Sequence, residues 1–281
     1  MKLGTATSVL YQHAIRDAIP IIADTGYDGV DIWGGRPHVY RQDLSSVELR
    51  DLRQYIEDHG LAVSSFMPAF YRYPHSLSNP NPKIRNDSIE YMRQCIDNAA
   101  MLEARIVLVV PDHSLHGQTK EESLQRMIES IDGIAQYASQ YDIKLGIEVL
   151  YYDETDLVNT SDDALSIIKE LGYANIGVVL DTGTLNLSKE PLQDTVAKLN
   201  GLLLQVHVND NEGGGKQQNL IPGEGTYNFK ELIHVLMKSG YSGYLSAELS
   251  KEYSDDPVPA LRTTAERIRA WIRESRQMTG Q

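Results

Sequence analysis

Four short apolar runs decide the fold of this chain: IKLGIE (143–148), IGVVLD (176–181), LLLQVH (202–207) and YLSAE (244–248). Continuous apolar runs of this length are typical of strands that are buried on both faces of a parallel sheet. Each run ends on an ionisable residue, in order Glu148, Asp181, His207 and Glu248. Such a group at the end of a buried strand is costly unless it is paired, hydrogen-bonded or bound to a metal. Four of them on successive strands predict one shared site.

Four further apolar runs precede these and predict four more strands: KLGTA (2–6), GVDIW (29–33), AVSSFM (62–67) and RIVLVV (105–110). Between the runs lie amphipathic patterns with apolar residues three and four apart, as in Met127, Ile131 and Ile134. The segment Thr119–Glu122 resembles a capping box that starts a helix. Strands that alternate with helices indicate parallel pairing through right-handed crossovers.

Eight such repeats in 281 residues favour a closed (β/α)₈ TIM barrel, a single domain over residues 1–281. The alternative is an open, doubly wound sheet, which usually carries a Gly-rich fingerprint after its first strand. No such fingerprint follows KLGTA (2–6). In a barrel the carboxyl ends of the strands build the active site. The four ionisable residues all map to that face.

The composition indicates an ordinary globular protein and limits its partners. Lys and Arg number 26 against 39 Asp and Glu, which gives a net charge of −13. This charge disfavours nucleic acid and anionic membranes as partners. Cys95 is the only cysteine, so no internal disulfide forms and we expect a cytoplasmic protein. The N-terminus has no apolar stretch of a signal peptide, and no run is long enough to span a membrane.

The four ionisable residues predict one bound divalent metal ion. Taken singly they are weak signals, since a lone His is more often structural and Asp181 before Thr-Gly is often a helix cap. Together, three carboxylates in one barrel mouth would repel one another, and a divalent ion removes that penalty. Four protein ligands leave two positions of an octahedral site open, which suits Mn²⁺, Mg²⁺ or Co²⁺, while Zn²⁺ also accepts this ligand set.

A sugar could fill the open positions with neighbouring carbonyl and hydroxyl oxygens, and the ion would stabilise an enediolate as a Lewis acid. Glu148 and Glu248 come from opposite sides of the mouth and are the natural acid–base pair. Return of the proton to the opposite face of the same carbon is epimerisation. Its return to the neighbouring carbon is aldose–ketose isomerisation. The residues leave both outcomes open.

Several motifs resemble the xylose-isomerase-like sugar isomerases and epimerases over essentially the whole chain. The resemblance is carried by these segments: Glu148-Val-Leu, Asp181-Thr-Gly, Val206-His207-Val-Asn-Asp210, Ile221-Pro-Gly-Glu-Gly225 and Ala247-Glu248-Leu. It is closest to the ketose 3-epimerase branch. Within that branch, Tyr27-Asp-Gly-Val-Asp-Ile-Trp33-Gly-Gly-Arg-Pro-His38 resembles the enzymes that act on fructosamines of the fructoselysine type.

The resemblance implies that Glu148, Asp181, His207 and Glu248 are metal ligands and that the two Glu residues are also acid and base. It further implies that Glu154, six residues after Glu148, binds a substrate hydroxyl, although a solvated loop carboxylate is the plain alternative. Two positions depart from the simple ketose 3-epimerases. Thr184 stands where they have a His that contacts the ketose, and Gly213 stands where they have an Arg. These departures argue against a plain hexulose as substrate.

Five more residues are candidates for substrate contacts around the mouth. Trp33 could lie against the face of a sugar or pack in the core, and Arg36 could bind the carboxylate of a fructosamine or form a surface ion pair. His38 and His113 follow the second and fourth strands in loops that face the mouth. Lys216 lies in the loop Asn211–Gln218, whose glycines also suit a flexible lid.

Other functions compete with a 3-epimerase on the same scaffold. Aldose–ketose isomerase, hydroxypyruvate isomerase and inosose dehydratase could use a similar site. An abasic-site endonuclease would need more His ligands and a basic surface, and the chain has eight His and a charge of −13. A silent sugar-binding barrel would not require two opposed carboxylates. Because barrels of this kind commonly pair through their outer helices, a homodimer or homotetramer is expected.

Overall fold

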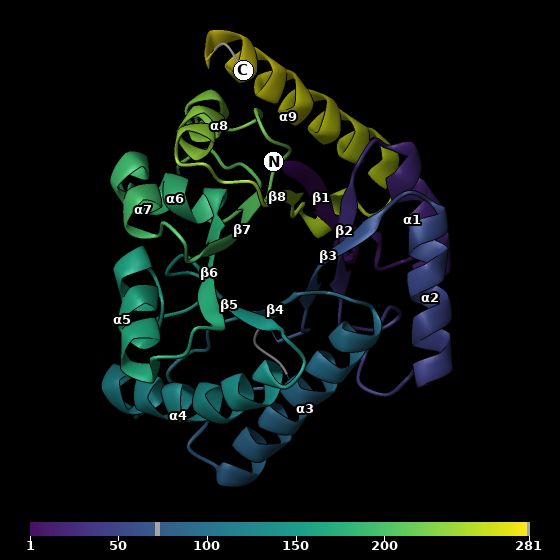
Figure 1. Ribbon diagram of the computed structural model, residues 1–281. Helices are drawn as coiled ribbons and strands as arrows, with labels where there is room; N and C mark the ends of the chain where they lie inside the picture. The colour runs from purple at the N-terminus through teal and green to yellow at the C-terminus, as the bar shows by residue number, and fades with distance from the viewer. Residues whose placement is uncertain (71–73, 280–281) are drawn as a thin grey trace.

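The computed structural model describes residues 1–70 and 74–279. In this part of the chain eight parallel strands close into one barrel in the order of the sequence (Figure 1). The strands are β1 (Lys2–Ala6), β2 (Gly29–Trp33), β3 (Ala62–Met67), β4 (Ile106–Val109), β5 (Lys144–Val149), β6 (Ile176–Asp181), β7 (Leu203–Val208) and β8 (Tyr244–Ala247). The barrel closes because β1 pairs with both β2 and β8. The predicted (β/α)₈ barrel is confirmed.

Helices surround the barrel as an outer ring (Figure 1). The α-helices are α1 (Ile15–Asp24), α2 (Ser46–Asp58), α3 (Pro82–Met101), α4 (Lys120–Ser139), α5 (Ser161–Leu171), α6 (Thr182–Ser188), α7 (Leu192–Lys198), α8 (Phe229–Lys238) and α9 (Pro257–Thr279). Two 3₁₀ turns, η1 (Thr7–Leu10) and η2 (Lys251–Tyr253), follow β1 and β8. Both turns lie at the mouth of the barrel and contact each other.

Several helices begin at a capping side chain, among them α2 at Ser45, α4 at Thr119 and α5 at Thr160. Thr119 and Glu122 form the predicted capping box at the start of α4, because each side chain bonds the other residue's backbone N–H. After β6 the structure has two short helices where the sequence suggested one. The chain reverses at Lys189, whose φ of 57° ends α6, and Pro191 then starts α7.

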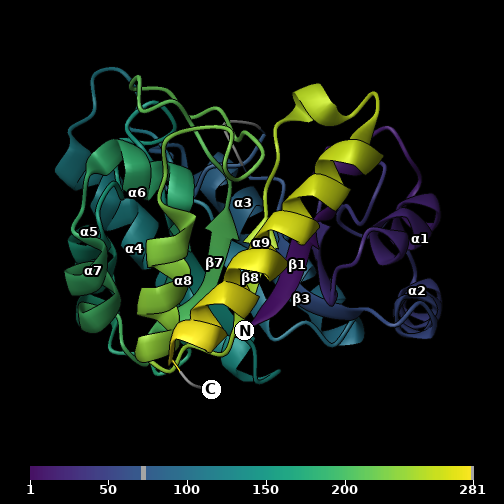
Figure 2. The same cartoon turned by 90° about the horizontal axis from the view of Figure 1, so that it is seen from above.

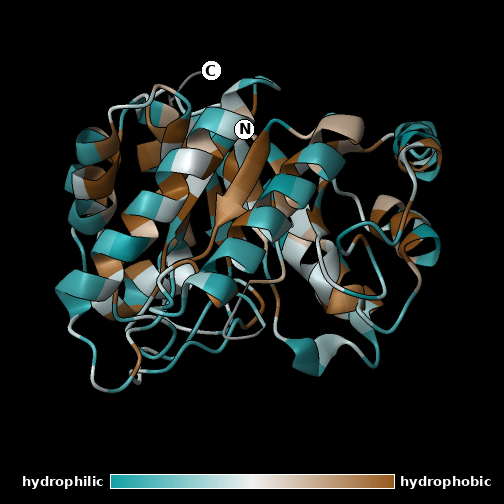
Figure 3. Cartoon of the chain, turned by 90° about the horizontal axis from the view of Figure 1, so that it is seen from below, coloured by the Kyte–Doolittle hydropathy of each residue, from teal (hydrophilic) through white to brown (hydrophobic). Residues whose placement is uncertain are grey.

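Apolar side chains fill the space between the barrel and the helices. Figure 3 shows brown, apolar helix faces turned toward the strands and teal, polar faces turned outward. The stripe predicted for α4 follows this rule, since Met127, Ile131 and Ile134 are fully buried. No helix within the described residues is long and apolar enough to cross a membrane.

The strands all run toward one end of the barrel, where the connecting loops gather (Figure 2). The N-terminus lies toward the opposite end, as does the last part of α9. Four strand ends differ by one residue from the predicted ones. β5 and β7 extend to Val149 and Val208, whereas β4 ends at Val109 and β8 at Ala247. Glu248 follows β8 directly. The four ionisable residues therefore share the loop-bearing end, as the sequence predicts.

Candidate active site

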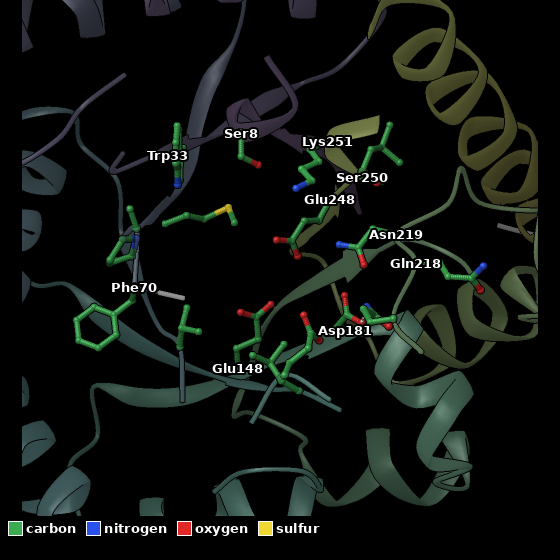
Figure 4. A pocket seen from close by; sticks show the side chains of 18 of the residues that line it. Ser8, Trp33, Phe70, Glu148, Asp181, Gln218, Asn219, Glu248, Ser250 and Lys251 are labelled. Atoms are coloured by element: carbon green, nitrogen blue, oxygen red, sulfur yellow. Dashed lines mark hydrogen bonds between the residues drawn. The ribbon is translucent and has the colours of Figure 1, made fainter. Parts of the chain in front are cut away.

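Glu148, Asp181, His207 and Glu248 meet at the mouth of the barrel. One ligand atom from each residue lies within 4.8 Å of the others. His207 is the centre of the cluster, because its Nδ1 atom lies 2.6 Å from Glu148 Oε1 and 3.1 Å from Glu248 Oε2. Strand pairing sets part of this geometry, since Asp181 on β6 lies beside His207 on β7. Figure 4 shows the three carboxylates pointing into one cavity.

Asp181 is held by three donors around it. Its Oδ1 atom accepts bonds from the Thr184 backbone N–H at 2.7 Å and from Gln217 Nε2 at 2.9 Å. Its Oδ2 atom accepts a bond from Asn209 Nδ2. The Thr184 bond makes Asp181 the N-cap of α6, so the same residue caps a helix and belongs to the cluster. Gly183 permits this packing, because a Cβ atom there would lie 2.3 Å from Asn209 Oδ1.

Burial and the neighbouring charges together shift the pKa values of the cluster. It raises the pKa of Glu148 to about 7, although the charge of His207 acts in the opposite direction. Burial and the charge of Glu248 raise the pKa of Asp181 to about 6. For His207 burial lowers the pKa, but the charges of Glu148 and Glu248 outweigh it and raise the pKa well above its ordinary value. Three carboxylates and one imidazole in a buried site are costly without a compensating charge.

The residues of this cluster fit a divalent metal ion. Oxygen and nitrogen donors are those that Mn²⁺, Mg²⁺, Co²⁺ and Zn²⁺ accept in proteins. The donors converge within 4.8 Å of one another, and three of the four residues are buried. Burial and the neighbouring carboxylates raise the pKa values of Glu148 and Asp181, and a divalent cation would neutralise this negative charge. A metal at this place would be held by Glu148, Asp181, His207 and Glu248.

A cavity of 560 Å³ opens directly above the cluster. The apolar lining includes Trp33 and Phe70, which lie across the cavity from Asn219 (Figure 4). Met67 adds to the apolar lining and Gln217 to the polar lining. A concave site with one apolar wall and a few polar groups is the usual form of a small-molecule site. The size and lining suit a sugar or a sugar derivative.

Glu154 lies beside the cluster and lines the cavity. Its Oε2 atom is buried and has no hydrogen-bond partner among the described residues. Burial, together with the charges of Asp181 and Glu248, raises the pKa of Glu154 to about 9. A protonated carboxyl at this place can donate a hydrogen bond to a substrate oxygen as well as accept one.

We expect Glu154→Gln to stabilise the metal-free protein at pH 8. The pKa of Glu154 in the folded protein lies above its ordinary value of 4.5. Glu154 therefore costs no stability below that ordinary pKa. Its ionisation destabilises the folded protein increasingly as the pH rises toward the folded pKa of about 9. Removing the charge should add about 1–3 kcal/mol to the free energy of unfolding at pH 8 and much less at pH 5. Urea unfolding at both pH values measures this.

The matched control for Glu154→Gln is Glu170→Gln, because Glu170 is exposed on α5. It should change the free energy of unfolding by no more than about 0.5 kcal/mol at either pH. An equal effect of Glu154→Gln at pH 5 and pH 8 would contradict the raised pKa.

The structure brings two of the six predicted substrate-contact residues to the cavity, Trp33 and Glu154. Arg36 instead forms a bidentate pair with Asp43, with its side chain 68% exposed. His38 is buried away from the cavity, where its ring contacts Thr7 Oγ1 at 3.0 Å and the His13 carbonyl at 3.2 Å. Burial lowers the pKa of His38 to about 4, so the ring is neutral at pH 7.

His113 and Lys216 also lie outside the described lining of the cavity. His113 lies in the loop after β4, and its carbonyl accepts a hydrogen bond from Ser78 Oγ. Lys216 is exposed, and the next residue, Gln217, reaches the cavity instead. The loop in which Lys216 was predicted to contact the substrate therefore does supply a side chain to the site, but that side chain is Gln217.

Sequence reasoning missed several residues of the site, among them three polar ones. Asn209 and Gln217 hold Asp181, and Lys251 lines the cavity from η2. Asn209 could have been found, because it lies two residues after His207 and so faces the same side of the chain. Gln217 and Lys251 lie in loops whose course follows no periodic pattern, so no local signal indicates them.

Thr184 and Gly213, the two departures from the ketose 3-epimerase pattern, each lie where the backbone conformation or packing is specific. Thr184 is buried at the first turn of α6 and donates its backbone N–H to Asp181. Gly213 has a φ of 73°, a conformation that a side chain makes costly. A backbone of this shape disfavours an Arg at Gly213, so the loop itself departs from that pattern.

Comparisons with known proteins agree with this fold and site. A family described as "Xylose isomerase-like TIM barrel" matches residues 19–275. Fructoselysine 3-epimerase of Shigella flexneri is 27% identical over 94% of each chain. D-psicose 3-epimerase of Agrobacterium fabrum is 24% identical over 81% of this chain and 76% of its own.

Among solved structures, a D-tagatose 3-epimerase-like protein superposes with a TM-score of 0.85 at 22% identity, over 99% of this chain and 100% of its own. The IOLI protein, solved with a zinc atom, gives a TM-score of 0.83 at 20% identity over 98% and 99% of the two chains. These likenesses bear on the fold. The curated relatives named above are epimerases, and the protein is accordingly an enzyme of the isomerase class. With its family model matched over residues 19–275, the chain belongs to the xylose isomerase-like TIM-barrel family.

Proposed function

We propose that this protein is a metal-dependent sugar 3-epimerase that acts on a ketose or on a fructosamine of the fructoselysine type. One observation carries the proposal. Two buried or half-buried carboxylates, Glu148 and Glu248, lie on either side of His207 Nδ1 at the floor of a cavity of 560 Å³. The similarity to fructoselysine 3-epimerase and D-psicose 3-epimerase supports the choice of substrate class.

The two Glu residues would move the proton. In the proposed reaction one carboxylate removes the hydrogen of the C3 carbon as a proton, and the bonding electrons move into an enediolate with the neighbouring carbonyl. The other carboxylate gives a proton to the opposite face of C3, which inverts that carbon. Glu148 reaches the floor of the cavity from β5, where its carboxylate can exchange a proton with a bound substrate. Their placement from β5 and from the end of β8 suits two-sided proton transfer (Figure 4).

A divalent ion held by Glu148, Asp181, His207 and Glu248 would supply Lewis-acid stabilisation of the negative charge on the substrate oxygens. The preferred ion in this proposal is Mn²⁺, Mg²⁺ or Co²⁺, and Zn²⁺ also fits the donors. Glu154 would hydrogen-bond a substrate hydroxyl, since its carboxyl lines the cavity and its buried Oε2 atom has no hydrogen-bond partner among the described residues. The apolar wall of Trp33, Met67 and Phe70 would exclude water from the enediolate.

A fructosamine fits the charges of the cavity better than a plain hexulose. It carries a carboxylate from its amino acid, and Lys251 is the basic side chain among the described residues that line the cavity. Its side chain comes from η2 and lies beside Glu248 in Figure 4. We therefore assign Lys251, rather than Arg36, to the carboxylate of such a substrate, because Arg36 is already paired with Asp43.

Lys251→Met is expected to raise KM for fructoselysine about 10-fold and to leave KM for psicose within about twofold. One exposed ion pair with a substrate anion contributes about 1 kcal/mol or slightly more, which corresponds to this factor. Steady-state kinetics with both substrates measures the difference. Lys216→Met is the matched control, because Lys216 is exposed and lies outside the described lining. Equal changes in KM for both substrates would contradict a carboxylate contact at Lys251.

The rival activities on this scaffold differ in where the proton returns or in whether water is lost. None is favoured by a specific feature of the cavity. A multi-metal endonuclease is disfavoured, because the cluster found among the described residues contains a single His. The homodimer or homotetramer and the cytoplasmic location also belong to the proposal. Light scattering during gel filtration would test the assembly.

A further inference from the structure

A carboxylate that the proposed chemistry does not use lies inside the barrel next to the cluster. Asp31 is on β2 and is completely buried. The interior of such barrels is usually filled by branched apolar side chains. A carboxylate in that place is costly unless its charge is compensated, so its presence calls for a physical reason.

Three neutral donors surround Asp31 and define an inner polar group. Gln205 Nε2 donates to Asp31 Oδ2 at 2.7 Å, and the hydroxyls of Ser64 and Ser246 donate to the two carboxylate oxygens. These side chains come from β7, β3 and β8, so four strands converge on one carboxylate. Gly4 makes room for them, since a Cβ atom there would lie 2.9 Å from Ser246 Oγ and 3.3 Å from Ser64 Oγ.

The charged neighbour of Asp31 is His207. Asp31 Oδ2 lies 3.7 Å from His207 Nε2, and both side chains are fully buried. Among the described residues no Lys or Arg forms an ion pair with Asp31. The neutral donors satisfy its hydrogen bonds, but they do not compensate its charge. The negative charge of Asp31 can be compensated here by His207, either by a protonated imidazole or by a metal ion bound to that imidazole.

The two nitrogens of His207 face opposite groups. Nδ1 points at Glu148 and Glu248, on the side of the cavity. Nε2 points at Asp31 and has no hydrogen-bond partner among the described residues. The distance of 3.7 Å is too long for a hydrogen bond, and a shift of about 0.5 Å would bring the two atoms into hydrogen-bond range. An imidazole that gives one nitrogen to a metal usually donates its other N–H to a carboxylate or carbonyl.

We propose that Asp31 is a positioning residue for the metal site: it receives the Nε2–H of His207 and so keeps the Nδ1 lone pair directed at the metal. This inference rests on the proposed metal-dependent function. Asp31 acts through His207 and does not touch the substrate. The Ser64, Gln205 and Ser246 side chains fix the carboxylate that in turn fixes the imidazole.

The test is the affinity of Asp31→Asn for Zn²⁺, measured by calorimetry or by competition with a chelating dye at pH 7.5. Asn keeps the size of Asp but removes the charge that attracts the Nε2–H. We expect the dissociation constant to rise about 10- to 100-fold. Asp112→Asn is the matched control, since Asp112 is also a buried carboxylate that accepts bonds from two serines, Ser76 and Ser78. It should change the constant by no more than about twofold.

A second readout needs no variant. In the Zn²⁺-loaded wild-type protein, ¹⁵N NMR of the histidine rings should show His207 protonated at Nε2 and unprotonated at Nδ1, with slow exchange of the Nε2–H. This measurement decides the matter if Asp31→Asn does not fold. An Nε2–H of His207 that exchanges rapidly with solvent, or a proton on Nδ1, would overturn the inference.

The outcomes separate this inference from the proposed function. Wild-type protein that binds Zn²⁺ while Asp31→Asn binds it equally well would overturn the role of Asp31 and leave the metal site intact. A change in melting temperature alone, with unchanged affinity, would make Asp31 a merely structural residue. Wild-type protein that binds no divalent ion at all would overturn both proposals.

Discussion

Glu148→Gln is expected to lower kcat for C3 epimerisation about 10³-fold, and Glu248→Gln should do the same. Each variant loses one of the two groups that exchange a proton with C3, and it also loses the negative charge of a metal ligand. Steady-state kinetics at saturating Mn²⁺ measures the effect. Circular dichroism should show an intact fold, because the substituted side chains keep their size.

The two-sided mechanism adds a sharper expectation for these variants. With one carboxylate left, a single Gln variant should still exchange the C3 hydrogen of one epimer with D₂O while forming almost none of the other epimer. The two variants should differ in which epimer exchanges. Glu170→Gln, on the exposed side of α5, should leave turnover unchanged. Normal epimerisation by either cluster variant would refute the assignment of acid and base.

Removal of the metal is the second change with a large expected effect. Treatment with EDTA should reduce turnover to about 1% or less, and Mn²⁺ or Co²⁺ should restore it. The metal should also stabilise the folded protein, because the three carboxylates repel one another without it. An ion at about 100 times its dissociation constant adds about 2.7 kcal/mol, which raises Tm by about 5–10 °C.

The control for metal removal is Asp181→Asn, which should show little rise in Tm on addition of the same ion. The effect of the metal should also grow with pH. The raised pKa values of Glu148, Asp181 and Glu154 mean that the metal-free protein loses stability as the pH rises from about 5 to about 9. Full turnover by protein that contains no metal by mass spectrometry would refute the metal requirement.

The barrel and the four-residue cluster could be predicted from the sequence for one physical reason. Parallel strands that are buried on both faces leave long apolar runs, and a charged residue at the end of such a run stands out. Glu148, Asp181 and His207 follow this pattern, and Glu248 follows β8 directly. Strand order then places their side chains together without any knowledge of the loops.

The substrate contacts could not be predicted in the same way, because loop courses depend on contacts that are distant in sequence. Arg36 turns to Asp43 on the surface, and His38 reaches Thr7 in the turn after β1. Gln217 enters the cavity while its neighbour Lys216 faces solvent. Loops with no period give no signal for such choices.

Asp31 could have been recognised from the sequence as a charged residue inside a buried strand. It stands inside the apolar run GVDIW (29–33), two residues before Trp33, which lines the cavity. Residues two apart on a strand point to the same side, so Asp31 had to face the barrel interior. A charged residue in that position indicates a partner across the barrel, and the structure identifies His207 as that partner.

The most direct test of the account is proton NMR of a Mn²⁺-activated sample in D₂O, after removal of the paramagnetic ion, with fructoselysine, psicose, fructose and tagatose as separate substrates. The account predicts deuterium at C3 of one ketose or fructosamine, formation of its C3 epimer, and loss of both in EDTA. Deuterium at C1 or C2 with an aldose product would contradict 3-epimerisation and identify an aldose–ketose isomerase. Bound metal without exchange at C3 of any of these substrates would contradict the account as well.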